Sequence, residues 1–286
     1  AAQKGIDVVI KDISIENANG ALDYAAAFYD QRIKKKRMTE EQKAGYLAKI
    51  KPTADYADLA DCDIVIEAVF EDRGVKAAVT KDTEAVIKSS SVFATNTSAL
   101  PITELANASR NRPNFIGMHF FSPAEKMPLI EIICGEQTSD ETLARAFDLA
   151  QKLGKTPIVV NDGPGFFTTR TISQFISQSA ELLEEGVNPA LIESAARDSG
   201  QPVGPLAIID EMSQAMSYKN GQQAKADAEA QGNEWQDNAA ARILDKMVNE
   251  WDRKGKQYGA GYYEYPEGEP KYLWPGLKEH FARNGY

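Results

Sequence analysis

The chain has 286 residues, of which 43% are hydrophobic, enough to fill one large or two medium domains. Its formal net charge of −10 argues against nucleic acid as a partner, because phosphate contacts need clustered cations. No stretch reaches the roughly 18 apolar residues that a membrane span needs, and the N-terminus lacks a secretory pattern. The two cysteines, Cys62 and Cys134, are far apart and imply no disulfide framework. We therefore expect a cytoplasmic protein without a membrane span.

The first part of the chain alternates short β-branched runs with helical stretches. Strands are expected over 7–12, 62–72, 92–94, 115–121, 129–135 and 156–162, with a helix over about 139–153. Strands separated by helices favour right-handed crossovers and a mostly parallel sheet covered on both faces. The sequence therefore predicts an α/β, Rossmann-like, doubly wound domain over residues 1–162.

After residue 162 the pattern becomes helical. Apolar residues such as Ile172, Phe175 and Ile176 recur at helical spacing, and further helices are expected over 189–199, 203–217 and 238–251. A Gly- and Tyr-rich segment over 255–270 contains one short extended piece, in which alternating tyrosines favour packing over recognition. The sequence predicts an all-α domain over residues 163–286.

Ligands of open parallel sheets bind outside the carboxyl ends of the strands. Asp12, Glu71, the segment 96–98 and His119 all follow predicted strands. Each of the two acids is equally well explained as a helix cap or as a ribose ligand. No G-x-G-x-x-G motif precedes Asp12, so we expect the first strand and the pyrophosphate-binding glycine loop to lie upstream of residue 1.

The chain has two histidines, and His119 ends a strand twelve residues before Glu131, which lies on the next apolar run. A carboxylate on one ring nitrogen fixes the tautomer and raises the basicity of the imidazole, which makes the pair a general base. An isolated histidine is more often a satisfied core residue, but the strand-end position favours catalysis here. Ser98 would complete a hydrolase triad, although no G-x-S-x-G elbow surrounds it.

Five segments occur in a characteristic order: NTSAL (96–100), GMHFFSPAEKMPLIEII (117–133), NDGPGFFTTR (161–170), PVGPLAIIDE (202–211) and RKGKQYGAGYYEY (253–265). Together they resemble the 3-hydroxyacyl-CoA dehydrogenase family of fatty acid β-oxidation. The sequence around His119 is similar to that of the dehydrogenase part of bacterial multifunctional β-oxidation proteins. The resemblance implies NAD-dependent oxidation of L-3-hydroxyacyl-CoA to 3-ketoacyl-CoA. It also implies a substrate-binding and dimerising second domain, a connector-like tail from about residue 266, and either a homodimer or part of a larger chain.

The resemblance also implies roles for individual residues. His119 matches the catalytic base and Glu131 the acid that orients it, while Ser98 matches a serine beside the substrate oxygen and the nicotinamide. The positions that match contacts to the NAD adenosine and nicotinamide ribose are Asp12, Glu71 and Lys76. No metal site is implied.

Three positions qualify the resemblance. Thr169 stands among the catalytic residues where many relatives have Asn, and Ser122 replaces an Asn that contacts the nicotinamide in other members. Lys36 lies where relatives approach the CoA phosphates, and a solvated helix end explains it equally well. The missing glycine loop and Thr169 leave a further alternative open, which is a non-catalytic protein that binds acyl-CoA or a partner.

Overall fold

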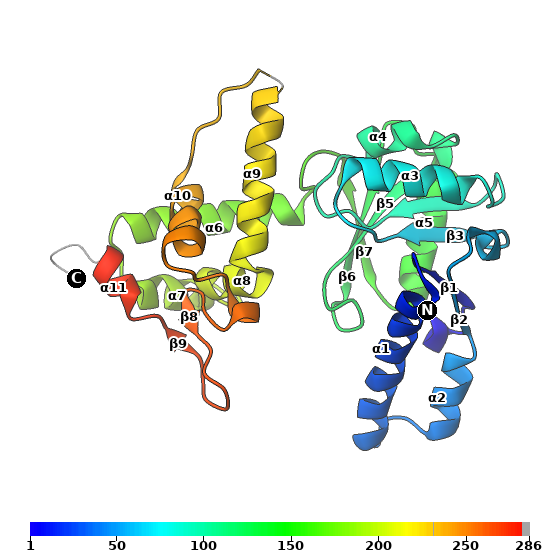
Figure 1. Cartoon of the computed structure of the whole chain (residues 1–286), viewed down its shortest axis with the longest axis horizontal. Coiled ribbons are helices and arrows are strands. Elements are labelled where there is room, and N and C mark those ends of the chain that lie inside the picture. Colours follow the sequence, from blue (N-terminus) through cyan, green and yellow to red (C-terminus); the bar gives the residue numbers. More distant parts are fainter. Residues whose placement is uncertain (231, 282–286) are drawn as a thin grey trace. The chain divides into compact units, whose positions relative to one another are not determined.

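A computed structural model describes residues 1–230 and 232–281 (Figure 1). The chain divides into two compact units, Ala1–Thr169 and Arg170–Tyr286. The helical pattern that the sequence placed after residue 162 begins with α6 (Thr168–Glu184), so the division lies inside the first turns of this helix.

The N-terminal unit contains a five-stranded sheet with the order β3-β4-β5-β6-β7 and a separate parallel pair, β1 and β2. Neighbouring strands are parallel except β5 and β6, which are antiparallel. The predicted mostly parallel sheet is confirmed. The strands span Val8–Lys11 (β1), Ile50–Thr53 (β2), Ile64–Glu67 (β3), Val92–Thr95 (β4), Phe115–Phe120 (β5), Leu129–Cys134 (β6) and Thr156–Asn161 (β7).

Strand pairing is interrupted between β1 and β3. Among the described residues, β1 pairs with β2 alone and β3 with β4 alone.

Helices cover both faces of the five-stranded sheet. On one face, α5 packs Ala146 and Ala150 against Val92, Ile116 and other alternate strand residues. The opposite face buries the other alternate set against α4 and Phe166, and α3 lies on this side next to α4 (Figure 1). The α-helices of this unit are α1 (Ile15–Lys34), α2 (Glu40–Leu47), α3 (Arg73–Glu84), α4 (Ile102–Leu105) and α5 (Asp140–Leu153), and the 3-10 helices are η1 (Ala2–Lys4), η2 (Tyr56–Leu59), η3 (Ala106–Ala108) and η4 (Arg112–Asn114).

Polar side chains cap the starts of the longer helices in the N-terminal unit. Ser14 accepts a hydrogen bond from a first-turn backbone N–H of α1, and Asp72 does the same for α3. Asp12 and Glu71 therefore precede the capping residues and leave that role to their neighbours. Lys36 follows the end of α1 as an exposed residue with a φ of 54°.

The C-terminal unit is mainly helical around one core. The predicted single helix over 203–217 is wrong, because the chain leaves the helix at Ser213, whose φ is 74°. The segment that follows α10 packs at this break, where the Ala215 N–H donates to the Lys254 carbonyl at 3.3 Å. The elements are α6, α7 (Pro189–Asp198), α8 (Pro205–Met212), α9 (Gln214–Ala230), α10 (Ala239–Asp245), the π-helix η5 (Lys246–Glu250), the 3-10 helix η6 (Lys256–Tyr258), the antiparallel pair β8 (Tyr263–Glu264) and β9 (Tyr272–Leu273), and α11 (Gly276–Phe281).

A buried carboxylate organises this second core. Asp210 on α8 is 1% exposed and accepts hydrogen bonds from the backbone N–H groups of Tyr262 and Tyr263, both at 2.9 Å. The Tyr265 hydroxyl and the Gln214 amide also donate to it, at 3.0 and 2.5 Å. Tyr262 and Tyr263 are both buried in the core, which agrees with the expected packing role, although a half-buried strand would bury only one of two adjacent residues. The motifs PVGPLAIIDE and GAGYYEY thus belong to one structural unit.

Candidate active site

Strand register brings His119 and Glu131 together. The antiparallel pairing of β5 and β6 places the two residues directly opposite each other, on the sheet face that also holds Phe166 and α4. His119 Nδ1 lies 2.7 Å from Glu131 Oε2. Because an ionised carboxylate only accepts hydrogen bonds, Nδ1 carries the proton and Nε2 is the basic nitrogen. No hydrogen bond from the described residues reaches Nε2, so it is available to a ligand.

Glu131 is fully buried and has several donors. Its Oε1 accepts from the backbone N–H groups of Phe167 and Thr168, at 3.2 and 2.9 Å, and its Oε2 accepts from the Thr168 hydroxyl at 2.7 Å. Burial is the largest single influence and raises the pKa of Glu131, but the hydrogen bonds from His119 and Thr168 together lower it below its ordinary value. The carboxylate therefore stays charged beside the imidazole.

A strained turn supplies the donors of Glu131. Phe166, in the segment PGFF, has a φ of 47°, an uncommon conformation for a bulky residue, and is 3% exposed. The turn leads into α6, whose first residues present N–H groups and a positive helix end to the carboxylate. Phe166 and Phe121 also flank the imidazole, with ring centroids 6.2 and 4.5 Å from that of His119.

A second polar cluster lies at the carboxyl ends of β3 and β4. One oxygen of Glu71 accepts from the Thr97 hydroxyl at 2.5 Å and from the Ser98 and Ala99 N–H groups at 3.0 and 3.2 Å. Ser98 is exposed, and within the described residues its hydroxyl makes no hydrogen bond. The Thr169 hydroxyl donates to the Ser98 carbonyl at 3.3 Å. Glu71 and Thr169 therefore hold the corner that presents Ser98.

A buried ion pair lies beneath this corner. Lys76 is 2% exposed, and its Nζ lies 3.0 and 3.2 Å from the two oxygens of Glu67 and 3.3 Å from Glu71. Glu67 also accepts from the Thr95 hydroxyl at 2.8 Å. Sequence reasoning placed Lys76 on the cofactor and missed Glu67, although a Glu that ends an apolar strand run was a usable signal. In the structure Lys76 forms ion pairs with both Glu67 and Glu71, and it therefore helps to hold Glu71 in place.

The remaining predicted residues lie apart from these clusters. Asp12 Oδ1 accepts from its neighbour's N–H and from the Asn17 side chain, at 2.6 and 3.4 Å. Ser122 is exposed in the loop between β5 and β6, as is Lys36 after α1. Within the described ranges, none of Asp12, Ser122 and Lys36 hydrogen bonds to the His119 or Ser98 clusters. The sequence analysis selected Thr169 and missed the adjacent Thr168, whose hydroxyl donates to Glu131.

The strand ends fit part of a dinucleotide. Asp12 and Glu71 offer carboxylates to ribose hydroxyls, and Ser98 offers a hydroxyl and a position near a nicotinamide. Ile13 and Phe70, beside the two acids, are 85% and 86% exposed and present apolar surface to flat rings. In the N-terminal unit as described, α1 opens with an acidic first turn, and the N–H groups of Phe167 and Thr168, which follow the glycine-containing turn before α6, are taken by Glu131. The described residues thus fit the ribose and nicotinamide ends but do not supply a pyrophosphate cradle.

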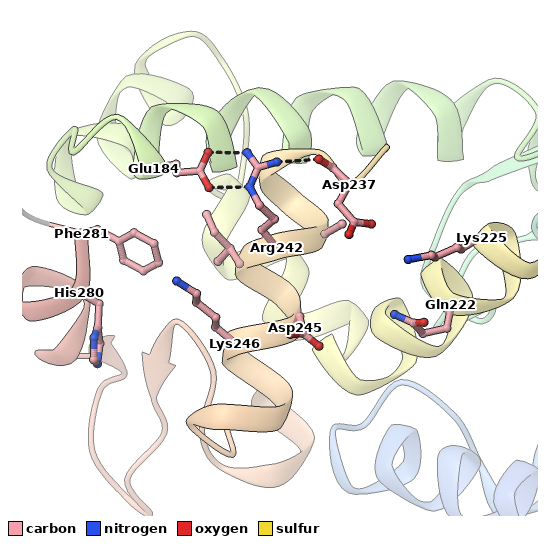
Figure 2. Close-up of a pocket in the computed structure, with 11 residues that line it drawn as sticks. Glu184, Gln222, Lys225, Asp237, Arg242, Asp245, Lys246, His280 and Phe281 are labelled. Carbon is pink, nitrogen blue, oxygen red and sulfur yellow. Dashed lines mark hydrogen bonds and ion pairs between the residues drawn. The ribbon is translucent and has the colours of Figure 1, made fainter. Parts of the chain in front are cut away.

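The C-terminal unit contains a separate cavity of about 590 Å³ (Figure 2). Figure 2 shows Arg242 in a two-point ion pair with Glu184, at 3.0 and 2.7 Å, and bonded to the Asp237 carbonyl at 2.6 Å. His280 at its edge stacks on Trp251 with centroids 4.1 Å apart. Because its charges are mixed and its histidine has no carboxylate partner among the described residues, we place the chemistry at His119.

Two family models match consecutive parts of the chain. The 3-hydroxyacyl-CoA dehydrogenase, NAD binding domain, matches residues 1–163, and the 3-hydroxyacyl-CoA dehydrogenase, C-terminal domain, matches residues 165–265. The chain belongs to the 3-hydroxyacyl-CoA dehydrogenase family. Its first part therefore corresponds to the NAD binding domain of this family, and the resemblance inferred from the five segments is confirmed.

Relatives of known sequence and structure agree with this 3-hydroxyacyl-CoA dehydrogenase assignment. The fatty acid oxidation complex subunit alpha of Shewanella baltica (strain OS185) is 38% identical over 268 residues, which are 91% of this chain and 36% of that relative. The chain thus spans about a third of that relative's length. (S)-3-hydroxybutyryl-CoA dehydrogenase from Ralstonia eutropha is 34% identical, with a TM-score of 0.84 over 93% of each chain. 3-Hydroxybutyryl-CoA dehydrogenase from Escherichia coli K12 is 31% identical, with a TM-score of 0.84 over 94% of this chain and 57% of that one.

Among the described helices, none has the length and apolar character needed to cross a membrane. Cys62 and Cys134 are both free thiols.

Proposed function

We propose that the chain oxidises L-3-hydroxyacyl-CoA to 3-ketoacyl-CoA in fatty acid oxidation, with His119 as general base. The observation that carries the proposal is the buried pair of His119 and Glu131 at 2.7 Å, whose basic nitrogen faces no protein donor among the described residues. NAD supplies the hydride acceptor when it is bound. The protein has to bind, orient and deprotonate the alcohol.

His119 Nε2 takes the proton of the substrate hydroxyl. The positive charge that develops on the ring is stabilised by Glu131, which is already ionised and oriented by two backbone N–H groups and by the Thr168 hydroxyl. The carboxylate does not need to move as the charge appears. It acts as a positioning group for His119.

The corner at 96–98 orients the reacting carbon in this proposal. The Ser98 hydroxyl donates to the substrate oxygen, and Asn96 ties the corner to the strand of the base, since its Oδ1 accepts from the Phe120 N–H at 2.8 Å. Glu71 holds the Ser98 backbone, and Lys76 and Thr169 support this arrangement.

The proposal extends to cofactor, substrate and setting. Asp12, Glu71 and Ser122 contact NAD, and Lys36 approaches the phosphates of CoA at the exposed end of α1. The matched relatives in the Shewanella group are subunits of fatty acid oxidation complexes. We accordingly propose a cytoplasmic protein that acts as a homodimer or as part of a larger multifunctional chain.

The test is consumption of NADH with acetoacetyl-CoA, followed at the reduced-nicotinamide band. We expect His119→Gln to lower turnover by about two orders of magnitude while acyl-CoA affinity changes little, because proton transfer matters mainly in the transition state. His280→Gln, which removes the other histidine of the chain, is the matched control and should keep its activity. Equal losses of turnover and affinity in His119→Gln would contradict a role as base.

One observation favours a second candidate, which is an acyl-CoA- or partner-binding protein without turnover. A hydroxyl has a single donor, and that of Thr169 is given to the Ser98 carbonyl at 3.3 Å, so it is not free to orient a substrate. The same assay separates the two, because acyl-CoA binding without NADH consumption supports this second function. Ester hydrolysis without NADH consumption would instead support the Ser98 hydrolase, for which the described residues show no hydrogen bond between Ser98 and His119.

A further inference from the structure

Two side chains share one oxygen of Glu131. His119 Nδ1 and Thr168 Oγ1 each lie 2.7 Å from Oε2, whereas Oε1 receives only the backbone N–H groups of Phe167 and Thr168 among the described residues. The backbone groups are sufficient to fix the position of the carboxylate. The Thr168 hydroxyl is therefore not needed for placement, and it competes with the imidazole for the same lone-pair density.

We propose that Thr168 is a positioning residue that limits the strength of the base, because its hydroxyl occupies the carboxylate oxygen on which His119 depends. The inference rests on the proposed function of the His119–Glu131 pair. A donor at Oε2 stabilises the carboxylate by itself and leaves less of its charge to stabilise an imidazolium. In agreement, the Thr168 hydroxyl contributes to lowering the pKa of Glu131, although burial, the largest influence, raises that pKa.

The surroundings of the imidazole make Glu131 the dominant charge. Strand β6 brings Glu131, and no other carboxylate of the described residues lies within ion-pair distance of the ring. On the other side of β5, strand β4 leads into the neutral Asn96, which bonds to the Phe120 backbone. The turn before α6 and the loop after β5 contribute the rings of Phe166 and Phe121. A change in the hydrogen bonds to Glu131 Oε2 should therefore alter the basicity of His119 directly, because no second carboxylate of the described residues lies within ion-pair distance of the ring.

The test is an NMR titration of the histidine rings in the intact chain, which needs neither cofactor nor turnover. The chain has two histidines, so His119 is assigned by His119→Gln, and His280 serves as an internal reference. Thr168→Val is nearly isosteric and removes only the hydroxyl. We expect the midpoint of the His119 titration to move to higher pH than in the parent, since removal of one donor makes Oε2 a better acceptor. His280 should keep its midpoint.

Two further variants keep the inference testable. Thr168→Ser restores a hydroxyl and should return the midpoint to that of the parent. Thr169→Val removes the neighbouring hydroxyl, which donates to the Ser98 carbonyl and not to Glu131, and should leave the midpoint unchanged. An unchanged or lowered midpoint in folded Thr168→Val would overturn the inference, and so would a Thr168→Ser midpoint equal to that of the Val variant.

The activity profile separates this inference from the proposed function. If the chain turns over, the acid limb of kcat/KM should move in Thr168→Val in parallel with the NMR midpoint. A shifted midpoint in a chain that consumes no NADH would retain the role of Thr168 and contradict the dehydrogenase. Turnover of NADH with an unmoved midpoint would retain the dehydrogenase and contradict the role of Thr168.

Discussion

The two units each contain a buried carboxylate that receives two backbone N–H groups, yet the two carboxylates differ in their remaining partners. Glu131 has an imidazole and a hydroxyl at 2.7 Å, whereas Asp210 has a side-chain amide at 2.5 Å and a phenol at 3.0 Å. The pKa of Glu131 lies below its ordinary value and that of Asp210 above it, because burial dominates where no positive charge can form beside the acid.

Under the proposed function, the difference separates a reactive acid, Glu131, from a structural one, Asp210. Glu131 has an ionisable partner with a basic nitrogen open to a ligand, so its charge can be used during a reaction. Asp210 has only neutral donors and holds the segment of Tyr262 and Tyr263 against α8. Burial of a carboxylate does not by itself mark a functional site, and the nature of its donors decides the matter.

The largest effect should come from the structural acid. Asp210→Asn should lower the free energy of unfolding of the C-terminal unit by about 3 kcal/mol, because an amide cannot accept from all four donors. Trp235, Trp251 and Trp274 all lie in this unit, so tryptophan fluorescence during urea unfolding reports on it alone. Glu211→Ala, which removes the exposed neighbouring acid, should change stability by less than about 0.5 kcal/mol. Equal effects of the two substitutions would contradict the organising role of Asp210.

A smaller loss of stability is expected at the reactive acid. Glu131→Gln should cost about 1 to 2 kcal/mol, because one oxygen still accepts from the backbone of α6 while its amide faces His119 and the Thr168 hydroxyl. Hydrogen exchange of β5 and β6 measures this loss. Turnover should fall far more than stability, and the double variant with His119→Gln should be little worse than either single one. Additive losses of activity would separate the two roles.

The smallest expected effect is on the free energy of unfolding at acidic pH. As the pH falls, Glu131 should lower this free energy and Asp210 should raise it. The folded pKa of Glu131 is lowered from 4.5, so its contribution to stability is present above that pH and is lost as the pH falls through the folded value. The folded pKa of Asp210 is raised from 3.8, so protonation favours the folded form as the pH falls toward 3.8. Unfolding of each unit between pH 6 and 3, compared with Glu131→Gln and Asp210→Asn, measures both slopes. Slopes of the same sign from the two carboxylates would refute the comparison.

The sequence predicted the parts of the fold that depend on periodicity. The alternation of strands and helices predicted the doubly wound sheet. The helix expected over about 139–153 corresponds to α5, which Ser139 caps and after which Gly154 takes a left-handed conformation. Periodicity did not predict the break at Ser213, because that break depends on a distant segment, Lys254–Gly255, which packs there.

The site was predictable to the extent that strand ends reveal it. His119 and Ser98 were noted because they lie at or just after the ends of apolar runs, and Glu131 because it is an acid on the apolar run that follows His119. Thr168 was not predicted, since it acts through a hydrogen bond to Glu131, far away along the chain. Glu67 was missed although it ends an apolar run, because its partner Lys76 was assigned to the cofactor. Spacing in sequence carries no information about which of two adjacent threonines points at a buried acid.

The reversal of direction between β5 and β6 has a consequence for how the site is assembled. Because these strands are antiparallel neighbours, the imidazole and its carboxylate are only twelve residues apart and are closed by one local hairpin. Short loops close quickly and at low entropic cost. We expect this pair to form early in the folding of the N-terminal unit, before the long crossovers complete the rest of its sheet.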